Sequence, residues 1–401
     1  MKRLTIFKRN LLRAAALLLA LLTAALLPSC TVSDLYERPT ESGTVLLSPN
    51  QSGGGEEGKT SIKNVILIIG DGMGLEHINA AQLCTGNRFR FTGWQYFSVD
   101  SDSVDANGKG AILTDSAASG TALATGHLTV NGYVGKSYAG DDVSTLLDEA
   151  GMLGKATGIV TTDALYGATP AAFSAHAYSR DDHAGIIASQ LSSGVDLLCG
   201  NADALCTDQR AAIEAAGYLY CDSLAAASNS IDAAQAYWQL SLEGTQAAVK
   251  LCDATLLALE FLSRDEDGFC LMVEQAHIDK YSHSNSIAEV IQCVSDLNDT
   301  VNTVLTWLGD RTDTAIIVTA DHETGGLSVS SRDRFASTYD GEGGRIYYEF
   351  SSTDHTVAYV GVFVFGVQVD PKSYSYKSSY LVKNADVYHI ACDLLHQRTA
   401  P

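Results

Sequence analysis

Five apolar runs of strand length alternate with segments of helical periodicity along this chain of 401 residues. The runs are NVILIIG (64–70), KATGIVTT (155–162), GFCLMVE (268–274), TAIIVTA (314–320) and VAYVGVFVFG (357–366). Segments such as DVSTLLDEAGML and SIAEVIQCVSDLNDTVNTVLTWLG lie between them and have the apolar spacing of helices. Strands that are apolar on both faces and separated by helices are typical of a parallel sheet covered on both sides. The sequence therefore predicts an α/β fold: a single domain over residues 61–398, with a largely parallel central sheet flanked by helices on both faces.

The first 60 residues differ in composition from the rest. Basic residues precede an apolar run at 14–27, which is short for a membrane span, and the segment ends in LLPSC. This pattern predicts a signal peptide of the lipoprotein type over residues 1–29, with Cys30 as the lipidated first residue of the mature protein. Residues 30–60, rich in Ser, Gly, Thr and Glu, are then a lipid-anchored flexible tether. A plain secretory signal cut near the same point is the alternative, and either leader predicts export to the periplasm or the cell surface.

The formal net charge of −21 restricts the possible partners. A strongly acidic chain is a poor partner for nucleic acid or anionic lipid, so we expect neither to bind. An acidic surface also repels anionic substrates at long range. An anion site in this chain must therefore create a strong local positive potential, for which bound metal ions are the obvious means.

The chain has nine cysteines, of which Cys30 belongs to the leader junction. An exported protein can form disulfides, and Cys199 and Cys206 are the closest pair in sequence. Other cysteines lie inside apolar runs such as FCLMVE and fit buried thiols equally well. Because the sequence has no CxxC motif, a cysteine-rich zinc module is not expected.

Acidic residues and histidines stand where the apolar runs end or begin. Asp71 follows VILIIG, Glu274 ends FCLMVE, Asp321 and His322 follow AIIVTA, and His355 precedes VAYVGVFVFG. In open α/β sheets the binding site lies at the carboxyl ends of the strands. An ordinary loop residue or helix cap would explain any one of these positions alone. Their joint occurrence indicates a metal site at this edge of the sheet.

Asp279 and His283 add a second metal-binding signature. Their spacing of four residues places them on one face of a helix, within reach of one metal ion. His277 lies off that face, and we interpret it as structural. The whole set offers more ligands than one zinc ion accepts, so two or three metal ions are implied. Mixed nitrogen and oxygen ligands suit zinc, whereas ligands that are all oxygen suit magnesium.

The stretch TDSAASGTALATG (114–126) contains a candidate nucleophile. Asp115 and Ser116 precede a run of small residues, and both residue types cap helices, so capping alone would explain the pair. The alternative is a nucleophilic Ser116 at the positive end of a helix, where an anion such as phosphate is favoured.

The chain resembles the alkaline phosphatases in blocks that follow the same order from about residue 63 to residue 366. The blocks are VILIIGDGMG, TDSAASGTALATG, GKATGIVTT, ATPAAFSAHAYSR, MVEQAHIDKYSH, VTADHETGGL and DHT. The resemblance implies two zinc ions, one magnesium ion and a serine that becomes phosphorylated, Ser116. It also implies a set of ligands for each ion. These are Asp279, His283 and His355 for one zinc, Asp71, Asp321, His322 and Ser116 for the other, and Asp71, Thr169 and Glu274 for magnesium.

The same resemblance implies the activity: metal-dependent hydrolysis of small phosphate monoesters outside the cytoplasm. Arg180 matches the arginine that clamps the phosphate, and Lys280 matches a variable position of the substrate site. Zinc coordination can supply the alkoxide that a free serine lacks, so we expect Ser116 to serve both as helix cap and as nucleophile. Family members are often dimers, which makes a homodimer the expectation.

Gly167 departs from the family pattern. The family usually has Asp or His at this position, and that side chain orients water on the magnesium. Loss of such an outer partner commonly costs ~10–100-fold in affinity or activity. The resemblance therefore predicts a weaker third site, or one that accepts zinc, and a Lys280 that lacks the acidic neighbour some members provide.

Other functions fit this sequence less well. Related enzymes hydrolyse phosphodiesters, but a diester has only two non-bridging oxygens and a second bulky group, so Ser116 with Arg180 suits a monoester better. A non-catalytic, ligand-binding surface lipoprotein would be expected to lack the nucleophile or the metal ligands, which are present here. The segment CTDQR at 206–210 is a near miss for a sulfatase signature because it lacks Pro. No site role is assigned to His176, His389 and His396.

Overall fold

The computed structural model describes residues 61–396. The predicted leader, Cys30 and the tether lie outside the described residues, as do the last two residues of the predicted domain. Everything below concerns residues 61–396.

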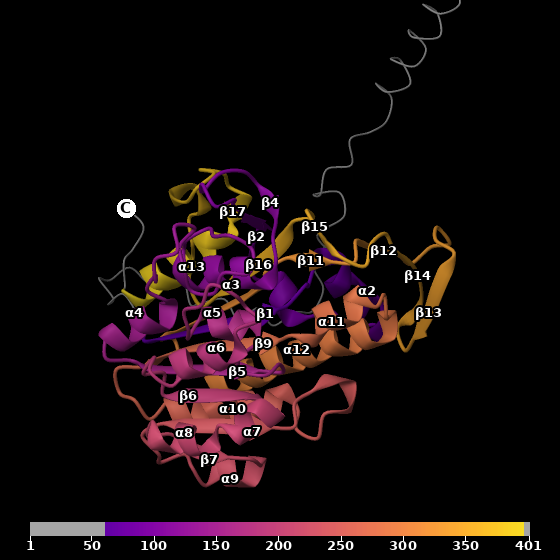
Figure 1. Ribbon diagram of the computed structural model, residues 1–401. Helices are drawn as coiled ribbons and strands as arrows, with labels where there is room; N and C mark the ends of the chain where they lie inside the picture. The colour runs from indigo at the N-terminus through magenta and orange to yellow at the C-terminus, as the bar shows by residue number, and fades with distance from the viewer. Residues whose placement is uncertain (1–60, 397–401) are drawn as a thin grey trace, which may run out of the picture. The chain divides into compact units, whose positions relative to one another are not determined.

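A ten-stranded sheet forms the centre of the described chain (Figure 1). Its strands, in spatial order, are β17 (Leu381–Lys383), β2 (Gln95–Asp100), β16 (Val360–Phe365), β10 (Thr314–Thr319), β1 (Asn64–Gly70), β9 (Phe269–Gln275), β5 (Ala156–Thr161), β6 (Leu197–Asn201), β8 (Ala236–Leu240) and β7 (Leu219–Cys221). The seven strands from β10 to β7 pair in parallel. Strand β16 runs antiparallel to both of its neighbours, β10 and β2. The predicted largely parallel sheet is confirmed.

Helices cover both faces of the sheet. Every residue of β1, β9 and β10 is buried, and successive side chains of a strand point to opposite faces, so both faces must be covered. One group of packed helices comprises α2 (Leu75–Thr85), α10 (Leu251–Leu262) and α12 (Ile287–Leu308). A second group comprises α3 (Ser116–Thr125), α4 (Leu146–Met152), α5 (Ala168–Ala172) and α13 (Asn384–Leu395). The predicted α/β architecture is therefore confirmed.

Helix α12 illustrates how the sequence produces this packing. Ile287, Val290, Val294 and Leu297 recur at helical spacing and are buried, so they form one apolar stripe that faces the sheet and its neighbours. Full burial of each such side chain stabilises the fold by about 1.5–3 kcal/mol. The helix ends at Gly309, whose φ of 52° lies in the left-handed region that favours glycine.

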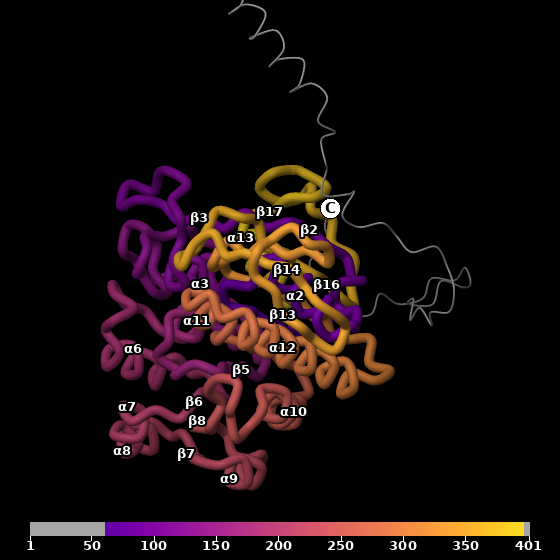
Figure 2. Tube along the Cα trace, turned by 90° about the vertical axis from the view of Figure 1, so that its right-hand side faces the viewer, coloured from indigo at the N-terminus to yellow at the C-terminus, as the bar shows by residue number. Residues whose placement is uncertain are grey.

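Smaller elements surround the core. Helices α6 (His183–Gln190), α7 (Ala204–Asp208), α8 (Arg210–Ala215) and α9 (Leu224–Ser228) belong to the segment that leads to the β7 edge of the sheet. A separate sheet of β12 (Leu327–Ser330), β14 (Gly344–Phe350) and β13 (Ser337–Gly341) lies beside α2, as Figure 2 shows. The sequence patterns used above did not predict this second sheet.

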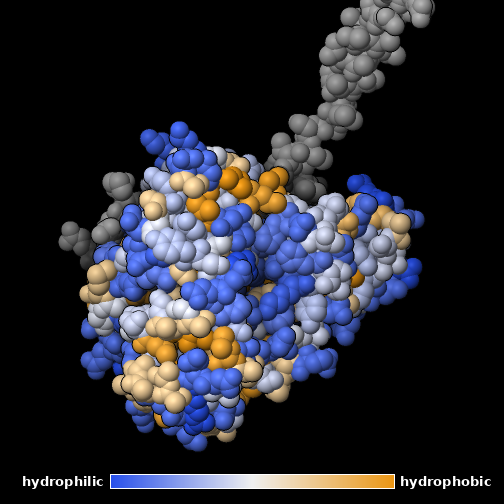
Figure 3. Space-filling view, in the orientation of Figure 1, coloured by the Kyte–Doolittle hydropathy of each residue, from blue (hydrophilic) through white to orange (hydrophobic). Residues whose placement is uncertain are grey.

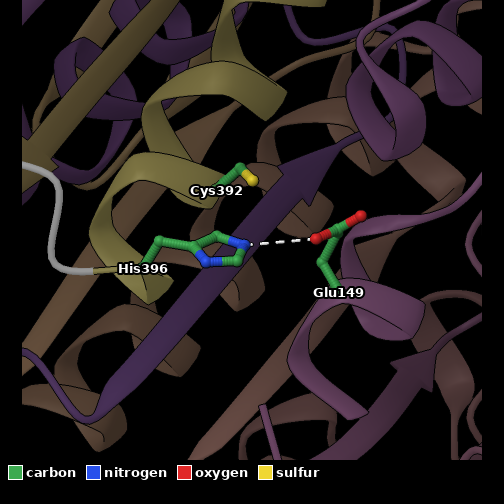
Figure 4. A group of neighbouring side chains, drawn as sticks. All are labelled: Glu149, Cys392 and His396. Carbon is green, nitrogen blue, oxygen red and sulfur yellow. Dashed lines mark hydrogen bonds and ion pairs between the residues drawn. The ribbon is translucent and has the colours of Figure 1, made fainter. Parts of the chain in front are cut away.

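The C-terminal helix α13 joins two other helices. His396, at its end, places Nε2 3.1 Å from Glu149 Oε2 of α4, with Cys392 one turn earlier beside them (Figure 4). Tyr388 of α13 packs against Gly126, the residue at the end of α3, and a Cβ there would lie 2.6 Å from the Tyr388 ring. Helix α13 thus fixes the far end of the helix that carries Ser116.

Among residues 61–396, no disulfide joins any of the eight cysteines. Seven are buried, including Cys199 in β6 and Cys206 in α7, and Cys252 is half-buried. Of the two interpretations left open by the sequence, buried thiols are confirmed.

The visible surface is mostly hydrophilic, with only small hydrophobic patches (Figure 3). This agrees with a formal net charge of −21. Within the described part of the chain, no helix combines the length and apolarity needed to cross a membrane.

Candidate active site

The predicted ligands gather at one edge of the sheet because of strand direction. Asp71 follows β1, Glu274 is near the end of β9, and Asp321 and His322 follow β10; these three strands are neighbours and parallel. His355 lies in the short strand β15 (His355–Thr356), before β16. Because β16 is antiparallel, its beginning lies at the edge where the other strands end. The strand directions therefore bring residues that are distant in sequence to one edge of the sheet.

Asp279, His283 and His355 form the first donor group. Helix α11 (His277–His283) carries the first two, four residues apart as predicted. Asp279 Oδ1 lies 3.4 Å from His283 Nε2 and 3.5 Å from His355 Nε2. One ligand atom from each residue lies within 4.8 Å of the others. This spacing allows all three to bind a single ion.

Backbone carbonyls orient both histidines of this group. Nδ1 of His283 donates to the carbonyl of Thr353, and Nδ1 of His355 donates to that of Thr114, 2.8 Å away. Each ring therefore turns Nε2 toward Asp279, the arrangement that metal-binding histidines commonly adopt. Burial acts to raise the pKa of Asp279, but hydrogen bonds with His283 and His355 outweigh it and hold that pKa well below its usual range.

Asp71, Asp321 and His322 form the second donor group, which is fully buried. His322 Nε2 lies 3.5 Å from Asp71 Oδ1 and 3.2 Å from Asp321 Oδ2. Burial, followed by the charges of Asp321, Asp279 and Glu274, raises the pKa of Asp71 well above its ordinary value. The negative charge of these neighbouring buried carboxylates favours a bound cation.

The hydrogen bonds around His322 determine which of its nitrogens carries the proton. The Thr324 hydroxyl donates to Asp279 Oδ1 and lies 3.2 Å from His322 Nδ1. Since that hydroxyl has only one proton, Nδ1–H of His322 must donate to its oxygen. Burial lowers the pKa of His322, so its Nε2 has a lone pair rather than a second proton. That lone pair faces two carboxylates, which suits a metal ion between them.

Ser116 lies at the start of α3, between these groups. Its Oγ is 3.2 Å from His322 Nε2, and the residue is 4% exposed. Asp115 is the N-cap of the helix, because its Oδ1 accepts from the backbone N–H of Ala118 at 2.9 Å. The expectation that Ser116 itself caps the helix is therefore wrong. Since Asp115 does the capping, the hydroxyl of Ser116 is available to point at the donor groups.

Asp71, Thr169 and Glu274 are the residues that the resemblance assigns to magnesium. Asp71 Oδ1 and Thr169 Oγ1 are buried and have no hydrogen-bond partner among the described residues. An unpartnered buried polar atom is costly, so both atoms fit an oxygen-binding cation that completes them. Burial, and next the charge of Asp163, raises the pKa of Glu274 to about 8. These residues fit magnesium by their donor chemistry.

Arg180 and Lys280 bring positive charge to the same region. Arg180 Nη1 lies 3.5 Å from Asp115 Oδ2, and its side chain is partly exposed. Lys280 Nζ lies 2.6 Å from Asp163 Oδ1. The expectation that Lys280 lacks an acidic neighbour is wrong, because Asp163 supplies one. Strand β5 ends two residues before Asp163, so the strand-end rule would have identified this residue had it been applied to KATGIVTT.

A polar cleft of about 290 Å³ opens beside these residues. Asp163, Gly167, Arg180, Glu243 and Lys280 are among the residues that line it. The cleft has room for a small substrate whose anionic end meets Arg180 and Lys280. The predicted zinc ligands thus come together in two groups, and Arg180 and Lys280 line the cleft. His277 Nδ1 instead meets Thr162 Oγ1 at 3.1 Å, in agreement with a structural role.

Comparison with known proteins adds three findings. The family model described as Alkaline phosphatase matches residues 62–199 and 234–376. Alkaline phosphatase 4 of Bacillus subtilis is 31% identical over 315 residues, which cover 72% of this chain and 67% of the relative. The alkaline phosphatase from the Antarctic bacterium TAB5 superposes with a TM-score of 0.70 at 25% identity, covering 84% of this chain and 98% of its own.

A variant of the TAB5 alkaline phosphatase, in which a histidine is replaced by aspartate, is described with magnesium bound in its M3 site. It is 25% identical to this chain, with a TM-score of 0.69, and the match covers 84% of this chain and 99% of the variant.

Proposed function

Since this chain belongs to the alkaline phosphatase family and is an alkaline phosphatase, we propose that it hydrolyses phosphate monoesters through a phosphorylated Ser116. One observation carries the proposal. The hydroxyl of Ser116 lies 3.2 Å from His322 Nε2 of the second donor group, at the N-terminus of a helix. A nucleophile in this position meets the positive end of the helix and the cation sites together.

We propose that the donor groups hold two zinc ions and one magnesium ion. Asp279, His283 and His355 would bind one zinc; Asp71, Asp321, His322 and Ser116 would bind the other; Asp71, Thr169 and Glu274 would bind magnesium. The nitrogen and oxygen donors of the first two sets and the oxygen donors of the third support this division. When bound, the ions lower the pKa of the serine hydroxyl and of water and neutralise charge on phosphate oxygens.

The protein's own residues carry two displacements at phosphorus. In the first, Ser116 Oγ forms a bond to phosphorus while the ester P–O bond breaks, and the departing alcohol takes up a proton. In the second, a water oxygen attacks the phosphoserine, the Oγ–P bond breaks, Ser116 recovers a proton and inorganic phosphate leaves. Arg180 can donate two parallel hydrogen bonds to non-bridging oxygens, with Asp115 holding its guanidinium. Positioning and charge stabilisation are the main requirements of such a reaction.

The test uses the purified protein after chelator treatment. We would measure hydrolysis of an aryl phosphate monoester and the matching diester while adding zinc and then magnesium at alkaline pH. We expect zinc to restore monoester turnover, Ser116→Ala to abolish it, and acid-quenched wild-type protein to contain phosphate on the peptide with Ser116. Ser192→Ala, which changes an exposed serine in the turn after α6, is the matched control.

Two other outcomes would overturn the proposal. Preference for the diester would make the protein a phosphodiesterase. Zinc binding without turnover of either ester would make it a ligand-binding lipoprotein.

We also propose export and anchoring through a lipid on Cys30, on the basis of the leader pattern alone. Metabolic labelling with a fatty acid should mark the wild-type protein and not Cys30→Ala. The homodimer stays a prediction, which light scattering of the purified protein would test.

A further inference from the structure

We propose that Asp163 is a positioning residue of the active site. Its carboxylate anchors Lys280 and supplies the outer negative charge of the magnesium site. The carboxylate occupies the space that a side chain at residue 167 would otherwise fill. The inference rests on the proposed function for the identity of that site. It revises the expectation from Gly167, since a carboxylate is present although it comes from a different residue.

Asp163 is held at the carboxyl edge of the sheet by hydrogen bonds. Its backbone N–H donates to Thr161 Oγ1 at 2.9 Å, and that hydroxyl donates in turn to Glu274 Oε2. Asp163 Oδ1 accepts from Lys280 Nζ at 2.6 Å and from the N–H of Ala164 at 2.9 Å. The carboxylate is thus fixed on one side by a lysine of the substrate cleft. The backbone N–H of Asp163, rather than its carboxylate, connects through Thr161 to the proposed magnesium ligand Glu274.

The position of the second carboxylate oxygen of Asp163 explains why residue 167 is glycine. A Cβ at Gly167 would lie 2.7 Å from Asp163 Oδ2 and 3.0 Å from its Cγ. It would also lie 3.0 Å from the carbonyl oxygen of Ala164, which is backbone and cannot move freely. Asp163 and Gly167 both line the cleft. The glycine therefore makes room for the carboxylate of Asp163, so the two residues act as a pair.

The position of the Asp163 carboxylate links it to the proposed magnesium site. Its Oδ2 lies where a side chain at residue 167, the outer magnesium position of the family, would begin. The Asp163 side chain is 29% exposed, so one of its oxygens can accept hydrogen bonds from water in the cleft.

The experiment moves the carboxylate between the two positions. We would compare wild type with Asp163→Asn, Gly167→Asp, and the double variant Asp163→Gly with Gly167→Asp. Isothermal titration calorimetry would measure Mg²⁺ binding to the zinc-loaded proteins and binding of inorganic phosphate, two equilibria that do not depend on turnover. Asp310→Asn is the matched control, because Asp310 is exposed in the turn after α12, does not line the cleft and has no ion pair among residues 61–396.

We expect Asp163→Asn to weaken Mg²⁺ binding by ~10–100-fold, as loss of an outer partner commonly does, and also to weaken phosphate binding because Lys280 loses its anchor. Gly167→Asp alone should weaken Mg²⁺ binding too, since the new side chain displaces Asp163. The double variant should regain most of the lost affinity. Asp310→Asn should match wild type.

Unchanged Mg²⁺ and phosphate affinities in Asp163→Asn would overturn the inference. So would a double variant no better than Asp163→Asn, because the loss would then come from loop geometry rather than from the carboxylate. If Asp163→Asn fails to fold, Asp163→Glu replaces it and should weaken Mg²⁺ binding while retaining the charge. Failure of the proposed function is distinguishable, since it would appear as a wild type without monoesterase activity.

Discussion

The imidazole rings of His322 and His355 stack with their centroids 3.5 Å apart and an interplanar angle of 24°. His322 belongs to one donor group and His355 to the other, so this contact joins the two groups. Because each ring restricts the other, the two proposed zinc sites are expected to be coupled.

Replacing one of these rings should therefore affect both zinc sites. We expect His355→Ala to abolish zinc binding at its own group and to weaken binding at the His322 group as well. Metal analysis after dialysis against a zinc buffer would measure the zinc content of each protein. His389→Ala, which changes a histidine without a site role, should leave that content unchanged. Loss of one zinc ion with the other held at wild-type affinity would contradict the coupling.

Removing the metals should destabilise the fold. Burial, and next the charges of neighbouring carboxylates, raises the pKa values of Asp71 and Glu274, so these groups are costly to keep ionised without a cation. An ion at 1,000 times its dissociation constant stabilises a folded protein by about 4 kcal/mol. Thermal unfolding with and without chelator should show a lower Tm without metal and recovery on adding zinc. An equal Tm in both conditions would argue against ions at these groups.

Asp115 is expected to have two separable roles. Its Oδ1 caps α3, while its Oδ2 accepts from Gly132 N at 2.9 Å and lies 3.5 Å from Arg180 Nη1. Asp115→Ser should keep the cap and lose the contacts with Gly132 and Arg180, which raises KM for a monoester with a smaller stability loss than Asp115→Ala. Asp115→Ala should raise KM and also lose about 1 kcal/mol of stability. Urea unfolding and steady-state kinetics on both variants would separate the roles; equal stability losses in both variants would contradict them.

His77 should make the fold sensitive to acid. It is fully buried, with Nε2 3.0 Å from Ser282 Oγ and Nδ1 3.9 Å from Glu323 Oε1, and burial lowers its pKa to about 4 from 6.5. Between pH 6.5 and 4 the unfolded chain binds a proton that the folded chain does not, so stability is lost as pH falls, by at most roughly 3 kcal/mol. Above pH 6.5 this contribution is fully present.

The variant His77→Gln tests that contribution. Glutamine can still hydrogen-bond to Ser282 but does not titrate, so stability should fall less between pH 7 and pH 5 than in wild type. The exposed His127, changed to Gln, is the control. Denaturant unfolding at the two pH values gives the comparison, and identical losses in His77→Gln and wild type would refute the assignment.

The sequence predicted which residues meet at one edge of the sheet, because parallel strands bring their ends together there. Asp71, Asp321 and His322 needed only that rule, and Asp279 with His283 needed only helical spacing. His355 follows the rule in reverse, because β16 alone among the strands of the central sheet runs against both of its neighbours. The sequence VAYVGVFVFG does not reveal the direction of that strand, because an apolar run fits a parallel or an antiparallel strand equally well.

Other features depended on contacts that patterns do not contain. Asp115 and Ser116 are both capping residue types, and only the backbone geometry shows that Asp115 is the cap. Asp163 directly follows KATGIVTT and so obeys the strand-end rule, but only the structure shows that its carboxylate approaches Lys280. The sheet of β12, β13 and β14 escaped prediction because its strands are largely exposed and have no continuous apolar run.

The buried cysteines can report local unfolding of this protein. Burial raises the pKa of Cys84 and Cys206 to about 11 and that of Cys270 to about 12, so these sulfurs stay protonated and shielded even in alkaline solution. An alkylating reagent attacks only the thiolate of an accessible cysteine. Each of these sulfurs is therefore labelled only after the residues around it unfold locally. The labelling rates of Cys270, Cys84 and Cys206 would report the local unfolding of β9, α2 and α7 separately, without any engineered probe.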